Sequence, residues 1–401
     1  MKLQMGSLAT AAVAVLALSG CVANDAEADG AIPVTSSATD CAVDTDTATS
    51  GNITFDVTNS GDRVTEFYIL DEDGLSIVGE VENIAPGVSR TLTVQAQPGS
   101  YYTVCKPGMI GEGVGQAEFT VTGDAVEIDP EDAEAIKKAV ASYTSYTKTQ
   151  AAELVEGVRT FTDAYRAGDD EEARRLFPLA RINYERIEPT AGQFGDLDPK
   201  IDYRKPGAEA EGLEFTGFHR IEMDLWIDEA RRNYPDEKIV ALDKAGRADL
   251  ADRLVADVEE LYEQVHSTDF TLAVGDITNG AIGLLDEVAA PDGKLPGEEN
   301  EFAHTDLYDF YANVEGAEVA YTSVRDIAAA KGGDGEELVA ELDAQFAAMK
   351  ELLATYGSYE EGFVFYDTVG QPKRNELAAQ LNALSEPLSQ LTHTVLGVEP
   401  E

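Results

Sequence analysis

The chain changes its hydrophobic period near residue 130, and the two parts predict different secondary structure. Between about residues 41 and 128, apolar and polar residues alternate in short runs separated by turn residues. Such runs of period two, broken by Gly, Pro, Asn and Asp about every ten residues, are typical of a small β-sandwich. The clearest runs are NITFDVTNSGD, TEFYILDEDG, SRTLTVQAQPGSYYTVCKPG and AEFTVTGD.

After Pro130 the apolar residues step by three and four, which predicts helices. The first stripe, from Ile136 to Tyr165, predicts one long amphipathic helix. Gly168 supplies a C-terminal stop, and Asp169 with Glu172 is a start signal for the next helix. The sequence therefore predicts α+β as separate domains, a β-sandwich followed by an all-α helical bundle. The further stripes lie at about 171–190, 208–231, 243–266, 276–290, 300–330, 335–356 and 371–395.

One of these stripes carries ionisable residues on its apolar face, within the run GFHRIEMDLW at 217–226. His219 and Glu222 lie near the middle of the face that Phe218, Ile221 and Leu225 mark as buried. An unpaired buried carboxylate costs several kcal/mol or takes up a proton, so Glu222 needs a compensating partner. Side chains at i and i+3 project from the same side of a helix, so the two can converge on one metal ion. A plain buried hydrogen bond between them is the alternative.

The N-terminal segment has the features of an export signal. Lys2 precedes the small and apolar stretch GSLATAAVAVLALSG, which is too short to span a membrane and predicts a signal peptide over residues 1–20. The run LSGC resembles a lipobox, at which Cys21 is lipidated. The acidic, small-residue stretch that follows, residues 21–40, predicts a flexible tether. An ordinary cleavage site with an incidental cysteine is the alternative.

The charge balance narrows the class of partners. The 76 acidic and 29 basic side chains give a net charge of −47, spread over the chain rather than confined to a tail. Such a protein repels nucleic acid and anionic lipid, so we expect no nucleic-acid partner. Cations are the small partners that this charge favours.

The sandwich contains Cys41 and Cys105, and their role is open. Outside the cytoplasm two cysteines favour a disulfide, but a thiolate metal site is an equal alternative. A blue-copper centre is excluded, because it needs two imidazoles and the chain's histidines, at 219, 266, 304 and 393, all lie outside the sandwich. A looser mixed site would take its ligands from Cys41, Cys105, Glu66, Glu82 and Met109.

Four motifs follow one another along the chain: VENIAPG at 81–87, NYERIEP at 183–189, FTGFHRIE at 215–222 and HTDLYDFYANVEG at 304–316. In sequence and in order they resemble motifs of the EfeO family of iron-uptake components. The resemblance covers nearly all of the chain after the signal peptide. It implies a cupredoxin-like β-sandwich at 41–128 and an imelysin-like helical domain with an H-x-x-E motif at 131–398.

The resemblance also implies a metal site in each domain. His219 and Glu222 match the family's H-x-x-E motif, and we expect Asp236 and Glu315 to complete that site, with Glu188 and His304 in reserve. In the sandwich, positions where the family has Cys, Glu and Cys are matched by Cys41, Glu66 and Cys105.

For function, the resemblance implies an exported, lipid-anchored or periplasmic protein with iron as its cargo. Its partners would be a membrane iron permease and a dye-decolorising haem peroxidase. Imidazole with carboxylates suits ferrous or ferric iron and also zinc or manganese, and copper or zinc stay open as cargo.

Two rival functions come from other classes. Imelysin-like domains have been classed with peptidases, but the zinc-peptidase motif H-E-x-x-H is absent from the sequence, so we expect no hydrolase activity. A surface polysaccharide-binding or adhesion lipoprotein would fit the acidity and the lipid anchor. No aromatic platform for a sugar is evident, however.

Overall fold

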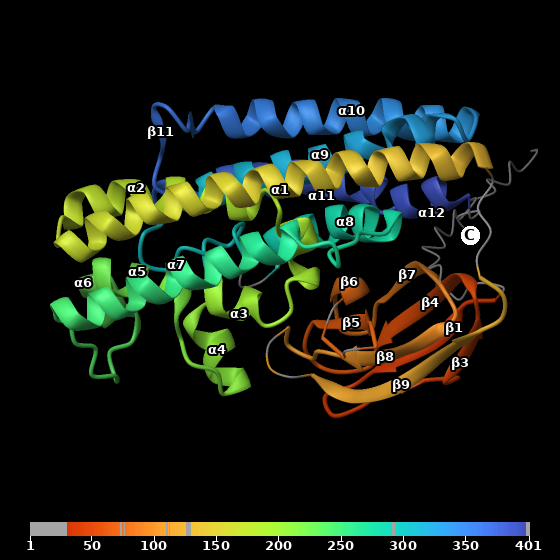
Figure 1. The fold of residues 1–401 in the computed structure, drawn as a ribbon, viewed down its shortest axis with the longest axis horizontal. Helices are drawn as coiled ribbons and strands as arrows, with labels where there is room; N and C mark the ends of the chain where they lie inside the picture. Colours follow the sequence, from red (N-terminus) through yellow and green to blue (C-terminus); the bar gives the residue numbers. More distant parts are fainter. Residues whose placement is uncertain are drawn as a thin grey trace, which may run out of the picture.

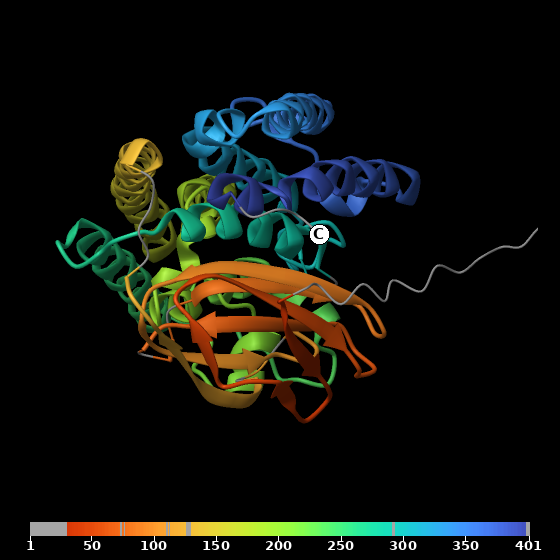
Figure 2. The ribbon, with the colours of Figure 1, turned by 90° about the vertical axis from the view of Figure 1, so that its right-hand side faces the viewer.

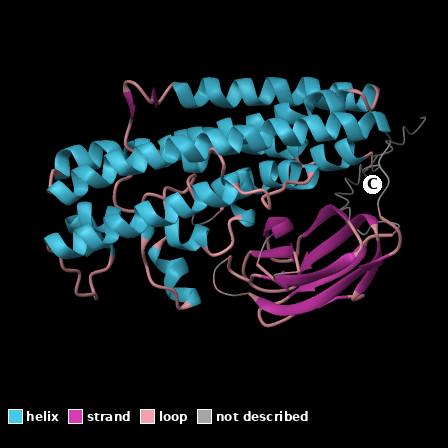
Figure 3. Cartoon of the chain, in the orientation of Figure 1, coloured by secondary structure: helices cyan, strands magenta, loops and turns pink. Residues whose placement is uncertain are grey.

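The computed structural model describes residues 30–72, 74–75, 77–109, 111, 113–125, 130–290 and 293–397. A β-sandwich, built from the first part of the chain, packs beneath a layer of long helices built from the rest (Figures 1 and 3). The predicted order, a sandwich followed by a helical domain, is confirmed. The predicted signal peptide and Cys21 lie outside the described residues.

The sandwich consists of a four-stranded and a five-stranded sheet. Their strand orders are β2-β1-β4-β7 and β3-β9-β8-β5-β6. Phe55, Phe67 and Phe119 meet in the core between the sheets. The ring centroid of Phe55 lies 5.3 Å from that of Phe67 and 5.5 Å from that of Phe119. The strands are β1 (Ile32–Ser36), β2 (Cys41–Val43), β3 (Thr47–Thr49), β4 (Gly51–Asn59), β5 (Thr65–Leu70), β6 (Ile77–Ile84), β7 (Ser89–Ala96), β8 (Gly99–Cys105) and β9 (Val114–Thr122).

The two sandwich cysteines form a disulfide, which settles the alternative left open by the sequence. Cys41 on β2 and Cys105 on β8 are buried and bonded to each other, with their Cα atoms 5.4 Å apart. A disulfide sulfur is not a thiolate, so the predicted thiolate metal site of Cys41, Glu66 and Cys105 is wrong for this state of the chain.

The sandwich begins earlier than the sequence suggested. The segment Ile32–Ser36, predicted as the end of the flexible tether, forms β1 and pairs with β4 in parallel. Val34 and Ser36 alternate inward and are buried, and the Ser36 hydroxyl lies 2.7 Å from the hydroxyl of Thr65. The residues before this short alternating run are acidic and small, so the whole segment was predicted as a tether.

Apart from the stripes at 208–231 and 371–395, each of which is divided between shorter helices, the helical stripes are confirmed with small shifts at their ends. None of the described helices is both long and apolar enough to cross a membrane. Glu172 N donates to the Asp169 carboxylate, as the start signal predicted. The elements are α1 (Pro130–Ala167), α2 (Asp170–Glu185), η1 (Glu188–Gln193), α3 (Leu197–Ile201), α4 (Lys205–Glu211), α5 (Gly217–Leu225), α6 (Ile227–Asn233), α7 (Lys244–His266), α8 (Val274–Ala289), α9 (Asp306–Ala329), α10 (Gly333–Ala354), β10 (Gly357–Ser358), β11 (Gly362–Phe363), η2 (Tyr366–Thr368), α11 (Gln371–Leu388) and α12 (Leu391–Leu396).

The stripe predicted as one helix over 208–231 is three short helices instead. Gly212 ends α4 in the left-handed conformation, and Gly217 starts α5 with a φ of 72°. A Cβ on Gly217 would lie 2.2 Å from the carbonyl oxygen of Ile201, so only glycine allows α5 to start against the end of α3. This close approach brings His219 next to Asp202.

The domains are joined by a polar and apolar interface. Helix α8 packs against β6, and α12 against β7 (Figures 1 and 2). Arg90 on β7 pairs with Asp286 on α8 at 2.7 Å, and the hydroxyl of Thr93 lies 2.8 Å from Nε2 of His393 on α12. These contacts hold strands β6 and β7 of the sandwich against helices α8 and α12 of the helical domain.

Candidate metal centre

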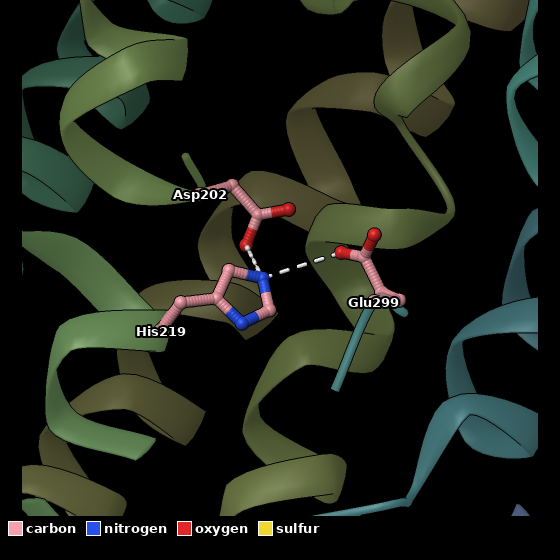
Figure 4. Close-up of side chains that lie close together, drawn as sticks. All are labelled: Asp202, His219 and Glu299. Carbon is pink, nitrogen blue, oxygen red and sulfur yellow. Dashed lines mark hydrogen bonds and ion pairs between the residues drawn. The ribbon is translucent and has the colours of Figure 1, made fainter. Parts of the chain in front are cut away.

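Three side chains from distant parts of the helical domain converge on one point. They are Asp202, which ends α3, His219 on α5, and Glu299 in the segment between α8 and α9 (Figure 4). One donor atom from each lies within 4.8 Å of the other two, and all three side chains are buried. We call these residues the triad.

The triad's spacing suits a single cation. Nε2 of His219 lies 3.2 Å from Oε1 of Glu299 and 3.6 Å from Oδ1 of Asp202. Donor atoms about 2.1 Å from a shared ion lie roughly 3.0–3.4 Å apart. Small shifts of the side chains would therefore place one imidazole nitrogen and two carboxylate oxygens around an ion.

Glu222 holds His219 from behind instead of joining the triad. Its Oε2 lies 2.8 Å from Nδ1 of His219, and its Oε1 accepts the backbone N–H groups of Phe302 and Ala303 at 2.9 and 2.8 Å. The structure thus contains the His–Glu hydrogen bond that the sequence left open as the alternative, and the prediction of Glu222 as a metal ligand is corrected. The other ring nitrogen of His219 faces Asp202 and Glu299. A carboxylate on the second nitrogen is the usual way to fix the tautomer of a metal-binding histidine.

The proton on the triad competes with a metal. Burial and Arg181 lower the pKa of His219, but Glu222, Glu299 and Asp202 outweigh them and raise it to about 9. Burial raises the pKa of Asp202 to about 6 against the opposing charges of Arg181 and His219. In the metal-free protein at neutral pH the imidazolium donates Nε2–H to Glu299. Metal binding releases that proton.

Two buried cations, Arg181 and Lys294, sit among the carboxylates around the triad. Arg181 pairs with four of them and Lys294 with four, two of which are shared. Together with the His219 imidazolium, the two cations face six carboxyl groups, and burial among these groups raises the pKa of Glu188 and Asp309, so protons balance part of the remaining charge. A metal ion could take the place of such protons. The carboxylates are those of Glu185, Glu188, Asp202, Glu287, Glu299 and Asp309.

A cavity of about 790 Å³ leads from the domain interface to the triad. Two triad residues, Asp202 and Glu299, form part of the cavity wall. Acidic side chains line both sides. The sandwich contributes Glu66, Glu80 and Glu82, and the helical domain contributes Glu188, Asp198, Glu287, Glu298 and Glu301. A cation entering between the domains would therefore pass these carboxyl groups on its way to the triad.

The raised pKa of Glu80, on the cavity wall, makes the stability of the metal-free chain depend on pH. Burial, with the carboxylates of Glu66 and Glu287, raises the pKa of Glu80 from 4.5 to about 8. A carboxyl group whose pKa is raised by folding stabilises the fold most below its unfolded pKa and loses that contribution as the pH rises through the folded pKa. Burial raises the pKa of Asp198 to about 7, with the same sign. We expect the melting temperature to fall by several degrees between about pH 5 and about pH 8.

Calorimetry with a chelator at constant ionic strength measures this dependence. The variant Glu80→Gln, which mimics the protonated side chain, should show a flatter profile than the wild type. A melting temperature that rises from the acidic to the basic end of this range would contradict the assignment.

The structure does not bring the other two predicted ligands of the helical site to the triad. Asp236 is exposed in the loop between α6 and α7. Glu315 lies on the flank of α9, where its Oε2 accepts from Arg186 at 2.9 Å and from the hydroxyl of Tyr359 at 3.0 Å. Both predictions are corrected, because a turn carries Asp236 into solvent and a salt bridge holds Glu315.

The remaining candidates lie around the site. Glu188 is on the cavity wall and pairs with Lys294 at 3.3 Å, so it is a neighbour of the triad. His304 precedes α9, with Nε2 3.9 Å from Glu229, away from the triad. In the sandwich, Glu66 lines the cavity and accepts the hydroxyl of Tyr68, while Glu82 and Met109 also line it.

Asp202 and Glu299 were missed by sequence reasoning. Asp202 ends a five-residue helix, and Glu299 lies in an irregular segment, so neither belongs to a hydrophobic stripe. The available signals were weak. They were an acidic pair, Glu298 and Glu299, shortly before the HTDLYDF motif, and Asp202 shortly before the run that leads into α5.

Comparisons with known proteins agree with both domains. The family model for imelysin, peptidase family M75, matches residues 139–391, and a cupredoxin-like domain model matches residues 8–115. A solved imelysin-like protein from Psychrobacter arcticum 273-4 aligns with a TM-score of 0.42 at 12% identity, over 69% of this chain and 98% of that protein. The two family models confirm the predicted cupredoxin-like and imelysin-like architecture.

Curated relatives extend over almost the whole chain. The iron uptake system component EfeO of Escherichia coli O157:H7 is 35% identical over 391 residues, 96% of each chain. Those of Escherichia coli K12 and Shigella flexneri are 34% identical over the same length. At this identity, and with both domain models matched, the chain belongs to the EfeO family of iron uptake system components.

Proposed function

We propose that this protein binds iron at the triad of Asp202, His219 and Glu299 and hands it to a membrane permease. The observation that carries the proposal is the donor set, one imidazole nitrogen and two carboxylate oxygens within 4.8 Å of one another. Carboxylate oxygen with imidazole suits ferrous and ferric iron, whereas copper(I) prefers sulfur ligands. Zinc also fits the donors, and the relatives' role in iron uptake favours iron over it.

The cavity supports reversible loading. It opens between the domains, and the carboxyl groups on its walls can give up protons and take cations next to the triad. On the sandwich side, Glu66, Glu80 and Glu82 would collect cations from solution, which gives the sandwich a role without a thiolate site. Transport requires a cargo that leaves again, and a cavity that reaches two of the three ligands provides the exit.

The proposed partners are those of an exported uptake system. They are the membrane iron permease that receives the cargo and a dye-decolorising haem peroxidase of the same system. Lipidation at Cys21 would anchor the chain at the outer face of the cytoplasmic membrane, or the chain would work in the periplasm. In either place the tether would let the folded domains reach the permease.

The arrangement favours a carrier over a metallopeptidase. A zinc hydrolase needs a carboxylate free to take a proton from metal-bound water. The motif's own glutamate, Glu222, is engaged on both oxygens, by the His219 ring and by two backbone N–H groups.

Equilibrium dialysis of the full chain against ferrous iron under anaerobic conditions, followed by elemental analysis, tests the proposal. We expect one tightly held iron per chain, lost in the double variant Asp202→Asn, Glu299→Gln. Parallel dialysis against zinc and copper measures the selectivity. Equal iron retention by the wild type and the double variant would contradict iron binding at the triad.

A further inference from the structure

Arg181, which is fully buried on α2, contacts each of the three triad residues. Its Nη1 donates to Oδ1 of Asp202 and lies 3.1 Å from Nε2 of His219, to which it donates when that nitrogen is unprotonated. Its Nη2 donates to Oε1 of Glu299 at 2.9 Å. These are the same three atoms that approach closely enough to share an ion. A metal can bind them only if the guanidinium gives them up.

The other edge of the same guanidinium is held by carboxylates outside the triad. Nε lies 3.3 Å from Oδ1 of Asp309, and Nη2 also donates to Glu185. Both of these carboxylates are completely buried. The guanidinium carbon also lies 5.4 Å from the ring centroid of Phe218, which favours a cation there. Arg181 can therefore leave the triad by a short movement and remain paired.

We infer that Arg181 is an internal competitor of the cargo, which holds the triad together when no metal is bound and moves onto Asp309 and Glu185 when one binds. This inference rests on the proposed function. Without metal, a resident cation keeps the two buried carboxylates, which would otherwise repel each other, assembled beside His219. It also lowers the net affinity for the cargo, because part of the binding energy is used to displace it. That reduction favours release to the next carrier.

Lys294 gives a matched control for charge. Its Nζ lies 3.3 to 3.8 Å from Glu185, Glu188, Glu287 and Glu299, of which only Glu299 belongs to the triad. Arg181 and Lys294 thus bring the same charge to the same buried cluster, and both side chains are fully buried. Only Arg181 occupies the ligand atoms. If only the charge matters, removing either residue should raise the metal affinity equally. If Arg181 competes directly for the ligand atoms, removing Arg181 should raise the affinity more than removing Lys294.

Metal titrations of the full chain with zinc, as a redox-inert probe, and with anaerobic ferrous iron distinguish these cases. We expect Arg181→Met to bind zinc about tenfold more tightly than the wild type, within the usual range of coupling between two sites. It should also release the metal more slowly. Lys294→Met should gain clearly less. Affinity of Arg181→Met equal to or below that of the wild type, or equal to that of Lys294→Met, would overturn the inference.

Arg181→Lys covers the case in which Arg181→Met does not fold. Its ammonium keeps the charge but cannot contact all three triad atoms at once in the fork geometry of a guanidinium, so we expect tighter binding than in the wild type. Binding no tighter than that of the wild type overturns the inference. If the wild type itself binds metal independently of Asp202, the proposed function fails. If its binding depends on Asp202 and no Arg181 variant binds more tightly, only the inference fails.

Discussion

Replacing His219 with glutamine is expected to lower the affinity for ferrous iron by about a hundredfold or more, equivalent to roughly 3 kcal/mol. Glutamine is close to histidine in length, and its amide can still donate to Glu222, so the packing around α5 should survive. It lacks the imidazole nitrogen that faces Asp202 and Glu299. Anaerobic titration calorimetry gives the affinity, and circular dichroism with melting curves shows that the fold is kept.

Two conservative substitutions serve as controls for this result. Asp236→Asn and Glu315→Gln remove acidic groups that sequence reasoning assigned to the site and that the structure places elsewhere. Both variants should bind iron as the wild type does. Iron affinity that falls in these variants and not in His219→Gln would place the iron away from the triad.

Glu222→Gln is expected to weaken metal binding strongly while the metal-free protein stays folded. The glutamine oxygen can accept the N–H groups of Phe302 and Ala303, as Oε1 of Glu222 does. Its NH₂ group then faces Nδ1 of His219, which must become an acceptor, so a neutral ring carries its proton on Nε2. That proton occupies the position of the metal. Loss of such an orienting partner typically costs 10- to 100-fold in metal affinity.

Thermal unfolding with and without metal shows this effect. At a hundredfold excess of metal over its dissociation constant, the wild type should gain about 2.7 kcal/mol of stability, and the variant should gain far less. Nitrogen NMR of the histidine ring would report the change of tautomer in the metal-free variant. An equal metal-induced gain in both proteins would show that Glu222 does not control the state of His219.

The periodic part of the fold could be predicted from the sequence. Alternation of period two between residues 41 and 128 marks strands whose inward residues fill the core, as Phe55 and Phe67 do. The stripe from Ile136 to Tyr165 belongs to the single long helix α1. These patterns are visible because burial on one face forces a repeat in the sequence.

The site could be predicted only in part, because its ligands do not repeat. His219 and Glu222 stand out as charged residues on an apolar face, and both are buried. The second carboxylate of the triad, Glu299, is 80 residues away from His219 in an irregular segment. Asp202 meets His219 only because Gly217 lets α5 start against α3. Such contacts depend on tertiary packing, which one sequence does not reveal.

Glu222 shows a second limit of sequence reasoning. The i, i+3 spacing placed it beside His219, and the two side chains are in contact at 2.8 Å. Spacing alone could not tell whether the pair shares a metal or whether one residue orients the other. In the structure the N–H groups of Phe302 and Ala303 donate to Oε1 of Glu222, and Oε2 is held by the His219 ring, so Glu222 orients His219.

An anomalous difference map at the iron absorption edge, from crystals of the iron-loaded full chain, tests iron binding at the triad most directly. We predict one strong peak roughly 2.2 Å from Nε2 of His219, in contact with carboxylate oxygens of Asp202 and Glu299. Glu222 should remain on Nδ1 of His219. Iron peaks confined to other carboxylates, with none beside His219, would contradict this assignment of the site.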